Sequence, residues 1–298
     1  MPGGLELSDA AETIRRGGLV AFPTETVYGL GANALDRQAV RRIYEAKGRP
    51  SSSPLIVHVC DLEMARSLTR EWPSMATVLA ASFWPGPLTL VLKKAEVVPD
   101  ELTAGLDSVA IRIPRHAIAL ELIRLAGVPI AAPSANRFTQ ISPTTAGHVR
   151  SGLGDLVDAI LDGGPTDIGI ESTVVTLTGD EPVLLRPGTI SLAELEEATG
   201  VKWLARNSEA SSSESPGLHR RHYAPRTPFF VLRAGRPGPT GNGRILEMPA
   251  DARSYAQTLY AEMHKADAEG WDWIAVREPP DGPAWAGIRD RLKRASSG

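Results

Sequence analysis

Short helical and strand patterns alternate through about the first 206 residues, and this alternation most limits the folds open to the chain. Apolar runs ended by proline or glycine predict strands at 19–22, 55–59, 88–92, 109–113, 129–132 and 173–177. Residues with a helical period predict helices at 9–16, 36–47, 75–83, 116–126 and 144–152. The order does not follow the simple strand–helix repeat of a doubly wound fold. We therefore predict a mixed α/β domain.

The character of the sequence changes near residue 206. Residues 207–215 are rich in serine and glutamate and have no apolar period, which is typical of a solvated linker. Strand and helix patterns return afterwards, with strands at 229–232 and 273–276 and helices at 251–268 and 284–294. We predict a first domain over 1–206, a linker over 207–226 and a small α/β domain over 227–298.

The composition argues against several classes of protein and of binding site. The only cysteine, Cys60, cannot form an internal disulfide or a cysteine-rich zinc site, which favours a reducing compartment. The formal net charge of −3 argues against a protein that grips duplex nucleic acid along its backbone. Neither a signal peptide nor an apolar stretch of about 20 residues is visible, so we expect a cytoplasmic protein without membrane contact.

The known phosphate-binding loops do not explain the sequence. There is no G-x-x-x-x-G-K-[ST] loop. Residues 29–34, GLGANA, fit G-x-G-x-x-A, but the preceding strand ends early at Pro23 and the next helix begins only near Asp36. A tight turn is the favoured explanation of these glycines, and a dinucleotide site is the alternative.

Cations are displayed by otherwise apolar elements. Lys47 and Arg49 flank the helix-ending Gly48; the helix dipole could explain Lys47, whereas Arg49 lies beyond the helix and suits bidentate phosphate binding. Ser108 and Arg112 share one face of the predicted strand 109–113 by the period of two. Arg112 needs a partner, and an internal salt bridge, a solvated face or a ligand would each supply one.

Further polar residues lie at strand ends or among apolar neighbours. His58 shares a strand face with Ile56, where a satisfied, partly buried histidine is the commoner outcome. Small polar groups at turns can approach an anion or a sugar closely, and a cation precedes one of these turns. These residues are Ser134, Asn136, Ser142, Ser172 and Arg186.

Taken together, the motifs resemble the YrdC-like family. The segments that carry the resemblance, in the order of the family, are FPTETVYGLG at 22–31, KGRP at 47–50 with His58 after it, SVAIRIP at 108–114, APSAN at 132–136, EST at 171–173 and LRPG at 185–188. SPG at 215–217 and HYAP at 222–225 resemble the tether of the longer, two-domain branch. The resemblance covers about residues 10–226 well and the rest loosely.

The resemblance implies synthesis of threonylcarbamoyl-adenylate and pyrophosphate from L-threonine, bicarbonate or CO2, and ATP with Mg²⁺, without an organic cofactor. It implies a twisted mixed sheet around a concave basic cavity, plus a small Rossmann-like domain. Proteins that transfer the threonylcarbamoyl group to transfer RNA are the implied downstream partners, and weak RNA binding stays open. The metal ligands are not implied.

The resemblance also assigns residues to two binding sites. It implies a threonine site formed by Thr26, His58, Arg112, Ala132 and Ser172. It implies an ATP site formed by Lys47, Arg49, Ser53, Ser108, Ser134, Asn136, Ser142 and Arg186, with His222 and Tyr223 folding back over the nucleotide. Lys47, Arg49 and Arg112 are the expected catalytic residues. The family usually has asparagine where Ser53 stands, so one nucleotide contact is expected to be weaker or water-mediated.

Two other functions compete with this interpretation. A related carbamoyl-transfer enzyme with another acceptor would be expected to carry additional metal-binding or acylphosphatase-like modules, and the sequence shows neither. A non-catalytic RNA-binding module would favour aromatic residues beside its cations, yet aromatic residues make up only 5% of the chain.

Overall fold

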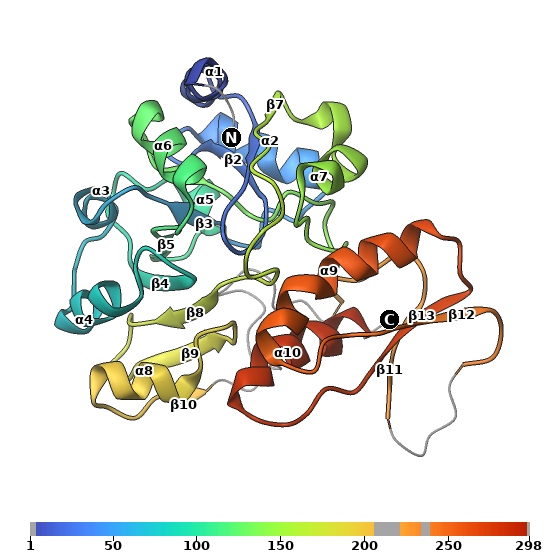
Figure 1. Cartoon of the computed structure of the whole chain (residues 1–298). Coiled ribbons are helices and arrows are strands. Elements are labelled where there is room, and N and C mark those ends of the chain that lie inside the picture. The colour runs from blue at the N-terminus through green and yellow to red at the C-terminus, as the bar shows by residue number, and fades with distance from the viewer. Residues whose placement is uncertain (1–3, 206–220, 234–238, 297–298) are drawn as a thin grey trace.

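Two β-sheets of different size organise the structure, a computed structural model that describes residues 4–205, 221–233 and 239–296 (Figure 1). The larger sheet has ten strands in the order β10-β9-β8-β4-β5-β3-β6-β2-β1-β7. Its strands are β1 (Val20–Phe22), β2 (Gly29–Asn33), β3 (Ile56–His58), β4 (Leu88–Lys93), β5 (Ser108–Arg112), β6 (Ile130–Ala131), β7 (Ala159–Ile160), β8 (Thr173–Thr176), β9 (Val183–Arg186) and β10 (Leu204–Ala205).

Parallel and antiparallel neighbours mix within this sheet. Strand β4 pairs antiparallel with β5 and parallel with β8, while β3 pairs parallel with β5 and antiparallel with β6. The predicted α/β class with a mixed sheet is therefore confirmed. Helices cover the sheet, and their bounds are α1 (Gly4–Arg15), α2 (Arg37–Lys47), α3 (Leu62–Ser67), α4 (Ser74–Phe83), α5 (Asp100–Thr103), α6 (Ala117–Ala126), α7 (Ala146–Gly152), η1 (Gly154–Leu156) and α8 (Leu192–Thr199).

Helix α2 shows how local sequence positions the site. Asp36 caps it by accepting hydrogen bonds from the backbone N–H groups of Gln38 and Ala39, and Gly48 ends it in the left-handed region at φ 61°. Both ends lie where the sequence predicts them. This sharp end sends Lys47 and the following Arg49 toward the sheet instead of along the helix axis.

The smaller sheet is parallel throughout, with β13 (Trp273–Arg277) between β11 (Phe229–Leu232) and β12 (Gly243–Leu246). Helices α9 (Ala252–Ala268) and α10 (Ala286–Ala295), the latter after η2 (Pro283–Trp285), pack against it. Their apolar core also includes Val27, Ile141 and Ile170 of the first part of the chain, so the two units share one hydrophobic cluster.

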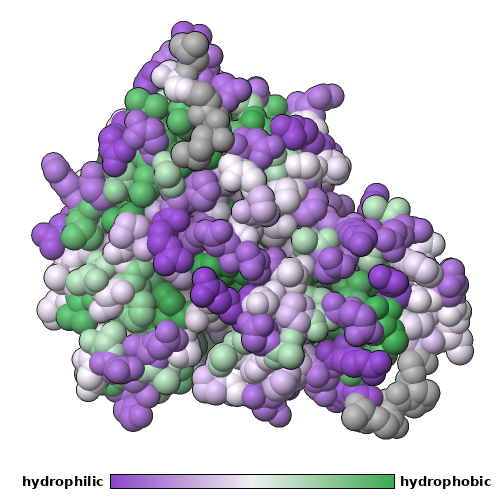
Figure 2. Space-filling view, viewed as in Figure 1, coloured by the Kyte–Doolittle hydropathy of each residue, from purple (hydrophilic) through white to green (hydrophobic). Residues whose placement is uncertain are grey.

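The proposed division at 206 and 226 stays a prediction, because residues 206–220 lie outside the described residues. On the face seen in Figure 2, hydrophilic residues run across the middle, where the two units meet. Within the described ranges, no helix is long and apolar enough to cross a bilayer.

The glycine-rich segment 29–34 corrects one expectation. It is the extended strand β2, between β1 and β6, and not a tight turn. A Cβ on Gly31 would lie 2.7 Å from the Phe22 ring and 2.9 Å from Ile130. The glycine therefore allows neighbouring side chains to close over the strand. The sequence patterns also missed short elements, among them α3, β9, α8 and β12.

Candidate functional site

A small polar cavity lies among residues from distant parts of the chain. Its free volume is about 40 Å³, room for a few water molecules at most. Ten of the residues predicted for the site line it, namely Thr26, Arg49, His58, Arg112, Ala132, Ser134, Ser172, Arg186, His222 and Tyr223. The fold thus brings all five residues predicted for threonine, and half of those predicted for ATP, to one place.

Arg112, at the end of β5, is held by three groups. Its Nε donates to the Gly86 carbonyl at 3.1 Å and its Nη1 donates to the Thr26 hydroxyl at 2.9 Å. Its Nη2 forms an ion pair with Glu25 Oε2 at 2.8 Å, but within the described residues this nitrogen has no hydrogen bond of good geometry. Of the three alternatives for Arg112, the structure shows the internal salt bridge, and the residue also lines the cavity.

Glu25 is the residue whose role the sequence did not reveal at this end. Its side chain is 0% exposed, and burial alone would raise its pKa. The nearby charge of Arg112 outweighs burial and lowers the pKa below its usual value. The pair is thus a carboxylate and a guanidinium whose plane is fixed by the surrounding loop.

His58, on β3, lies in the same wall. It is buried, its ring meets the Phe22 ring edge-on at 6.1 Å, and its Nδ1 has no hydrogen-bond partner among the described residues. Burial, followed by the charge of Arg112, lowers its pKa well below the usual value. The imidazole is therefore neutral at physiological pH, which suits packing against a neutral part of a ligand.

The end of α2 supplies two buried cations at the opposite side. Lys47 Nζ donates to the carbonyls of Ser134 at 2.5 Å and Asn136 at 2.6 Å, so it lies behind the cavity wall. Burial first, and then the charge of Arg49, lower the pKa of Lys47 well below its usual value. A phosphate arriving beside it would raise that pKa again.

Arg49 reaches the cavity itself. Its Nη2 donates to the Ser53 hydroxyl at 2.5 Å and to the Pro54 carbonyl at 3.0 Å. Burial, the largest cause, lowers its pKa to about 10, and the guanidinium stays charged at neutral pH. Ser53 is fully buried behind Arg49, so its visible role is to orient that side chain.

The EST segment and β9 form the third side. Arg186 donates through Nε and Nη2 to the Ser172 carbonyl at 3.2 and 3.0 Å, and through Nη2 to the Ser172 hydroxyl at 3.1 Å. That hydroxyl also shares a hydrogen bond of 2.8 Å with Thr89. Ser142 donates to Glu171 Oε1 at 2.5 Å, so Ser142 supports the cavity from behind.

His222 and Tyr223, which follow residues 206–220 in the sequence, complete the wall of the cavity. The two rings pack edge to face at 4.1 Å, and Tyr223 has a left-handed backbone with φ 62°. The next residue, Ala224, donates its N–H to the Thr139 carbonyl at 2.9 Å. These contacts hold residues 222–224 over the cavity, whereas predicted linker residues 207–220 lie outside the described residues.

The remaining predicted residues do not line the cavity. Asn136 uses its side-chain amide to bind the carbonyls of Arg137 and Gln140. Ser108 begins β5, about 13 Å from Arg112 at the usual strand rise. Lys47, Ser53 and Ser142 support the cavity from behind through the contacts given above.

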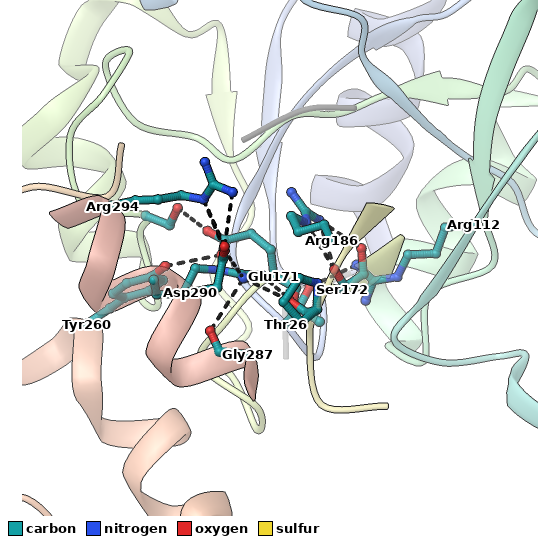
Figure 3. A network of polar contacts seen from close by, with 12 residues as sticks. Thr26, Arg112, Glu171, Ser172, Arg186, Tyr260, Gly287, Asp290 and Arg294 are labelled. Carbon is teal, nitrogen blue, oxygen red and sulfur yellow. Dashed lines mark hydrogen bonds and ion pairs between the residues drawn. The ribbon is translucent and has the colours of Figure 1, made fainter. Parts of the chain in front are cut away.

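A residue from the small unit was missed altogether. Arg291, on α10, donates through Nε to Glu171 Oε2 at 2.7 Å, and its side chain is 0% exposed. Figure 3 shows the polar network around Glu171, with Tyr260 of the small unit beside it. In the sequence, the RDRLKR run around it has the composition of a solvated helix end. Only the fold shows that Arg291 and Arg294 of this run are buried, and that Arg291 binds Glu171, which lines the cavity.

Comparison with known families matches two profiles in succession along the chain. The profile of the Sua5–YciO–YrdC family, described as "Telomere recombination", matches residues 12–188. A second profile, "Threonylcarbamoyl-AMP synthase, C-terminal domain", matches residues 190–297. Together the two profiles account for nearly the whole chain.

Individual proteins of this family are also similar to the chain along nearly its whole length. The threonylcarbamoyl-AMP synthase of Pyrococcus abyssi is 42% identical, with 96% of this chain and 93% of the relative aligned. That of Bacillus subtilis is 40% identical over 98% and 93%. The crystal structure of P. abyssi Sua5 complexed with L-threonine superposes with a TM-score of 0.92 at 40% identity, covering 99% of this chain and 95% of that one. Escherichia coli YciO matches 63% of this chain and 91% of its own with a TM-score of 0.56 at 27% identity.

Proposed function

The chain belongs to the Sua5–YciO–YrdC family, and we propose that it joins L-threonine, bicarbonate or CO2, and ATP to give L-threonylcarbamoyl-adenylate and pyrophosphate. The observation that carries the proposal is the match of both units, in order, to synthases along nearly their full length. The cavity supports it, because guanidinium groups face an enclosed space from several sides.

At one end of the cavity, Arg112 binds the threonine carboxylate through its Nη2 donors. Glu25 and Thr26 fix the plane of the guanidinium, which favours one orientation of the amino acid. The neutral His58 and the small Ala132 face the rest of the ligand. The threonine amine, once carboxylated, then presents a carbamate oxygen to the α-phosphate of ATP.

At the other end, Arg49, Arg186 and Lys47 stabilise the charge that develops on the phosphates as pyrophosphate leaves. Transfer of a nucleotidyl group between oxygens needs positioning and charge more than covalent chemistry. Because the cavity now holds only about 40 Å³, residues 222–223 move outward to admit ATP and return over it.

Magnesium enters with ATP in this proposal. Among the described residues there is no group of three or more histidine, cysteine or acidic residues that could hold a metal, and both cavity carboxylates are paired with arginines. Mg²⁺ commonly binds through phosphates and water with few protein ligands. The adenylate product is then consumed by proteins that transfer the threonylcarbamoyl group to transfer RNA.

The test is pyrophosphate release by the purified protein with ATP, Mg²⁺ and bicarbonate. L-Threonine is compared with L-serine, L-valine and no amino acid, each with and without bicarbonate. We expect release that requires both threonine and bicarbonate. Release that ignores threonine, or no release, would contradict the proposal and favour another carbamate acceptor or binding alone.

A further inference from the structure

Arg291 joins two backbone segments that carry cavity residues. Besides the bond to Glu171 Oε2, its Nη2 donates to the Glu171 carbonyl at 3.1 Å and its Nη1 donates to the Pro187 carbonyl at 2.8 Å. Glu171 immediately precedes Ser172, and Pro187 immediately follows Arg186. One side chain of the small unit thus fixes the spacing of the two segments that present Ser172 and Arg186.

The backbones meet closely at the same place. A Cβ on Gly287 of α10 would lie 2.6 Å from the Gly188 carbonyl oxygen, and a Cβ on Gly188 would lie 2.4 Å from the Thr173 nitrogen. Two glycines therefore let α10 approach the turn after β9, and that turn approach the start of β8. The arrangement indicates a built contact and not a loose docking of two units.

Glu171 is enclosed on every side by polar groups from both units. Arg291 and the Tyr260 hydroxyl, at 3.1 Å, approach Oε2 from the small unit, and Ser142 donates to Oε1. Arg186, Lys47, Tyr223 and Asp290 are the other ionisable groups that interact with this cluster. Burial raises the pKa of Glu171, but Arg291, and after it Arg186, bring the pKa below its usual value.

We propose that Arg291 is a positioning residue of the synthase site: it neutralises Glu171 and thereby leaves Arg186 to the phosphates of ATP. The inference rests on the proposed function for the identity of that ligand. Without Arg291, the buried carboxylate would interact with Arg186 as the remaining guanidinium whose charge acts on it, or would repel the incoming phosphates. In this way a residue of the small unit sets the charge at the nucleotide end of the site.

The experiment is a double-mutant cycle on kcat/KM for ATP. We expect Arg291→Met to lower kcat/KM about 30-fold or more in the parent, the size typical of a broken buried pair. In a Glu171→Gln background the same change should cost less than about 3-fold, because the charge of Glu171 is gone and Asp290 keeps its ion pair with Arg294 at 3.0 Å. Arg291→Lys should fall between the two. Arg289→Met, on the same helix but paired with Asp281 and partly exposed, should leave kcat/KM unchanged.

The pH profile separates this role from simple structural support. Removing Arg291 raises the pKa of Glu171, so the ratio of variant to parent kcat/KM should increase as pH falls from 8 to 5.5 and the carboxylate takes up a proton. In the Glu171→Gln background this ratio should not change with pH. Equal losses in both backgrounds, or a ratio independent of pH, would overturn the proposal.

Two further readouts keep the test decisive. If Arg291→Met fails to fold, the Glu171→Gln/Arg291→Met protein has no unpaired buried charge and should recover folding; a double variant that also fails contradicts the proposal. The same double-mutant cycle can be measured on ATP binding by calorimetry, without threonine or bicarbonate. Intact coupling in binding without threonine-dependent turnover would remove the proposed reaction and retain the role of Arg291.

Discussion

Two buried carboxylate–guanidinium pairs flank the cavity, and they are built differently. Glu25 and Arg112 both belong to the large sheet and its loops, and Arg112 itself lines the cavity. Glu171 and Arg291 belong to different units, and the Arg291 donors go to Glu171, Pro187 and Asp290, all protein atoms. The first arginine is placed to bind a ligand, whereas the second is placed to hold the site together.

The comparison shows that similar ion pairs can play two roles: one presents a ligand-binding group, and the other supports the residues that do so. Arg112 is the sole ion-pair partner of Glu25 among the described residues, so that pair has little redundancy. Glu171 has the Ser142 and Tyr260 hydroxyls as well as Arg291. A buried pair with spare partners tolerates change better than one without them.

The largest effect is expected when the Glu25–Arg112 pair is broken. Arg112→Ala should lower threonine-dependent kcat/KM by about 30- to 1000-fold, the cost of removing a desolvated donor from a developing charge. Steady-state pyrophosphate release measures it. Arg115→Ala changes an exposed arginine three residues later and should have little effect. If Arg112→Ala turned over threonine as well as the parent, the carboxylate assignment would be wrong.

Glu25 and Glu171 should differ in how much each contributes to the free energy of unfolding. Glu25→Gln leaves Arg112 buried without a counter-charge and should lower the free energy of unfolding by about 3 kcal/mol. Glu171→Gln should lower it by about 1 kcal/mol. The reason is that Arg291 keeps Asp290, at 2.9 Å, and the Pro187 carbonyl as partners. Urea unfolding of both variants checks the order, and equal or reversed losses would show that redundancy does not protect the second pair.

Acid should weaken the contact between the two units. His148 and His264 stack at 3.9 Å across this junction, and burial, followed by His148, lowers the pKa of His264 to about 4. Between about 6.5 and 4, the unfolded chain binds more protons than the folded one, so stability falls as pH decreases. The slope is at most about 1.4 kcal/mol per pH unit, less because the ring is partly exposed.

Unfolding curves at pH 7 and pH 5 measure this loss. His264→Gln removes the titrating group and should flatten the dependence on pH. His116→Gln serves as the comparison, since that histidine lies near Glu25 in the first part of the chain. An unchanged slope in the His264 variant would mean that the acid sensitivity arises elsewhere.

The smallest expected effect concerns the support of Arg49. Ser53→Ala removes the hydroxyl that accepts from Arg49 Nη2, although the Pro54 carbonyl remains as an acceptor. We expect KM for ATP to increase by about 3- to 10-fold, the usual cost of one hydrogen bond to a charged group. Ser51→Ala, an exposed serine of the same loop, is the matched control. A larger loss than for Arg112→Ala would reverse the proposed division between binding and support.

Much of the large sheet and of the site could be predicted from the sequence. Helix α2 begins after Asp36 and ends at Gly48 as expected, because capping and the left-handed glycine are local properties. Arg112 was identified because an arginine among alternating apolar residues needs a partner. Strand β2 was missed because its glycines indicate turns locally, and only the close packing of Phe22 and Ile130 against Gly31 in the folded sheet explains that glycine.

The sequence by itself determined the mixed α/β class, the family and the residues at the ends of strands, since all of these depend on local patterns and motifs. The tertiary structure alone decided which charges meet. Nothing near Arg291 distinguishes it from the exposed Arg289, yet the packing of α10 against Gly188 buries one and leaves the other partly exposed. Burial and pairing are properties of the space around a residue, and that space is filled by segments more than a hundred residues apart.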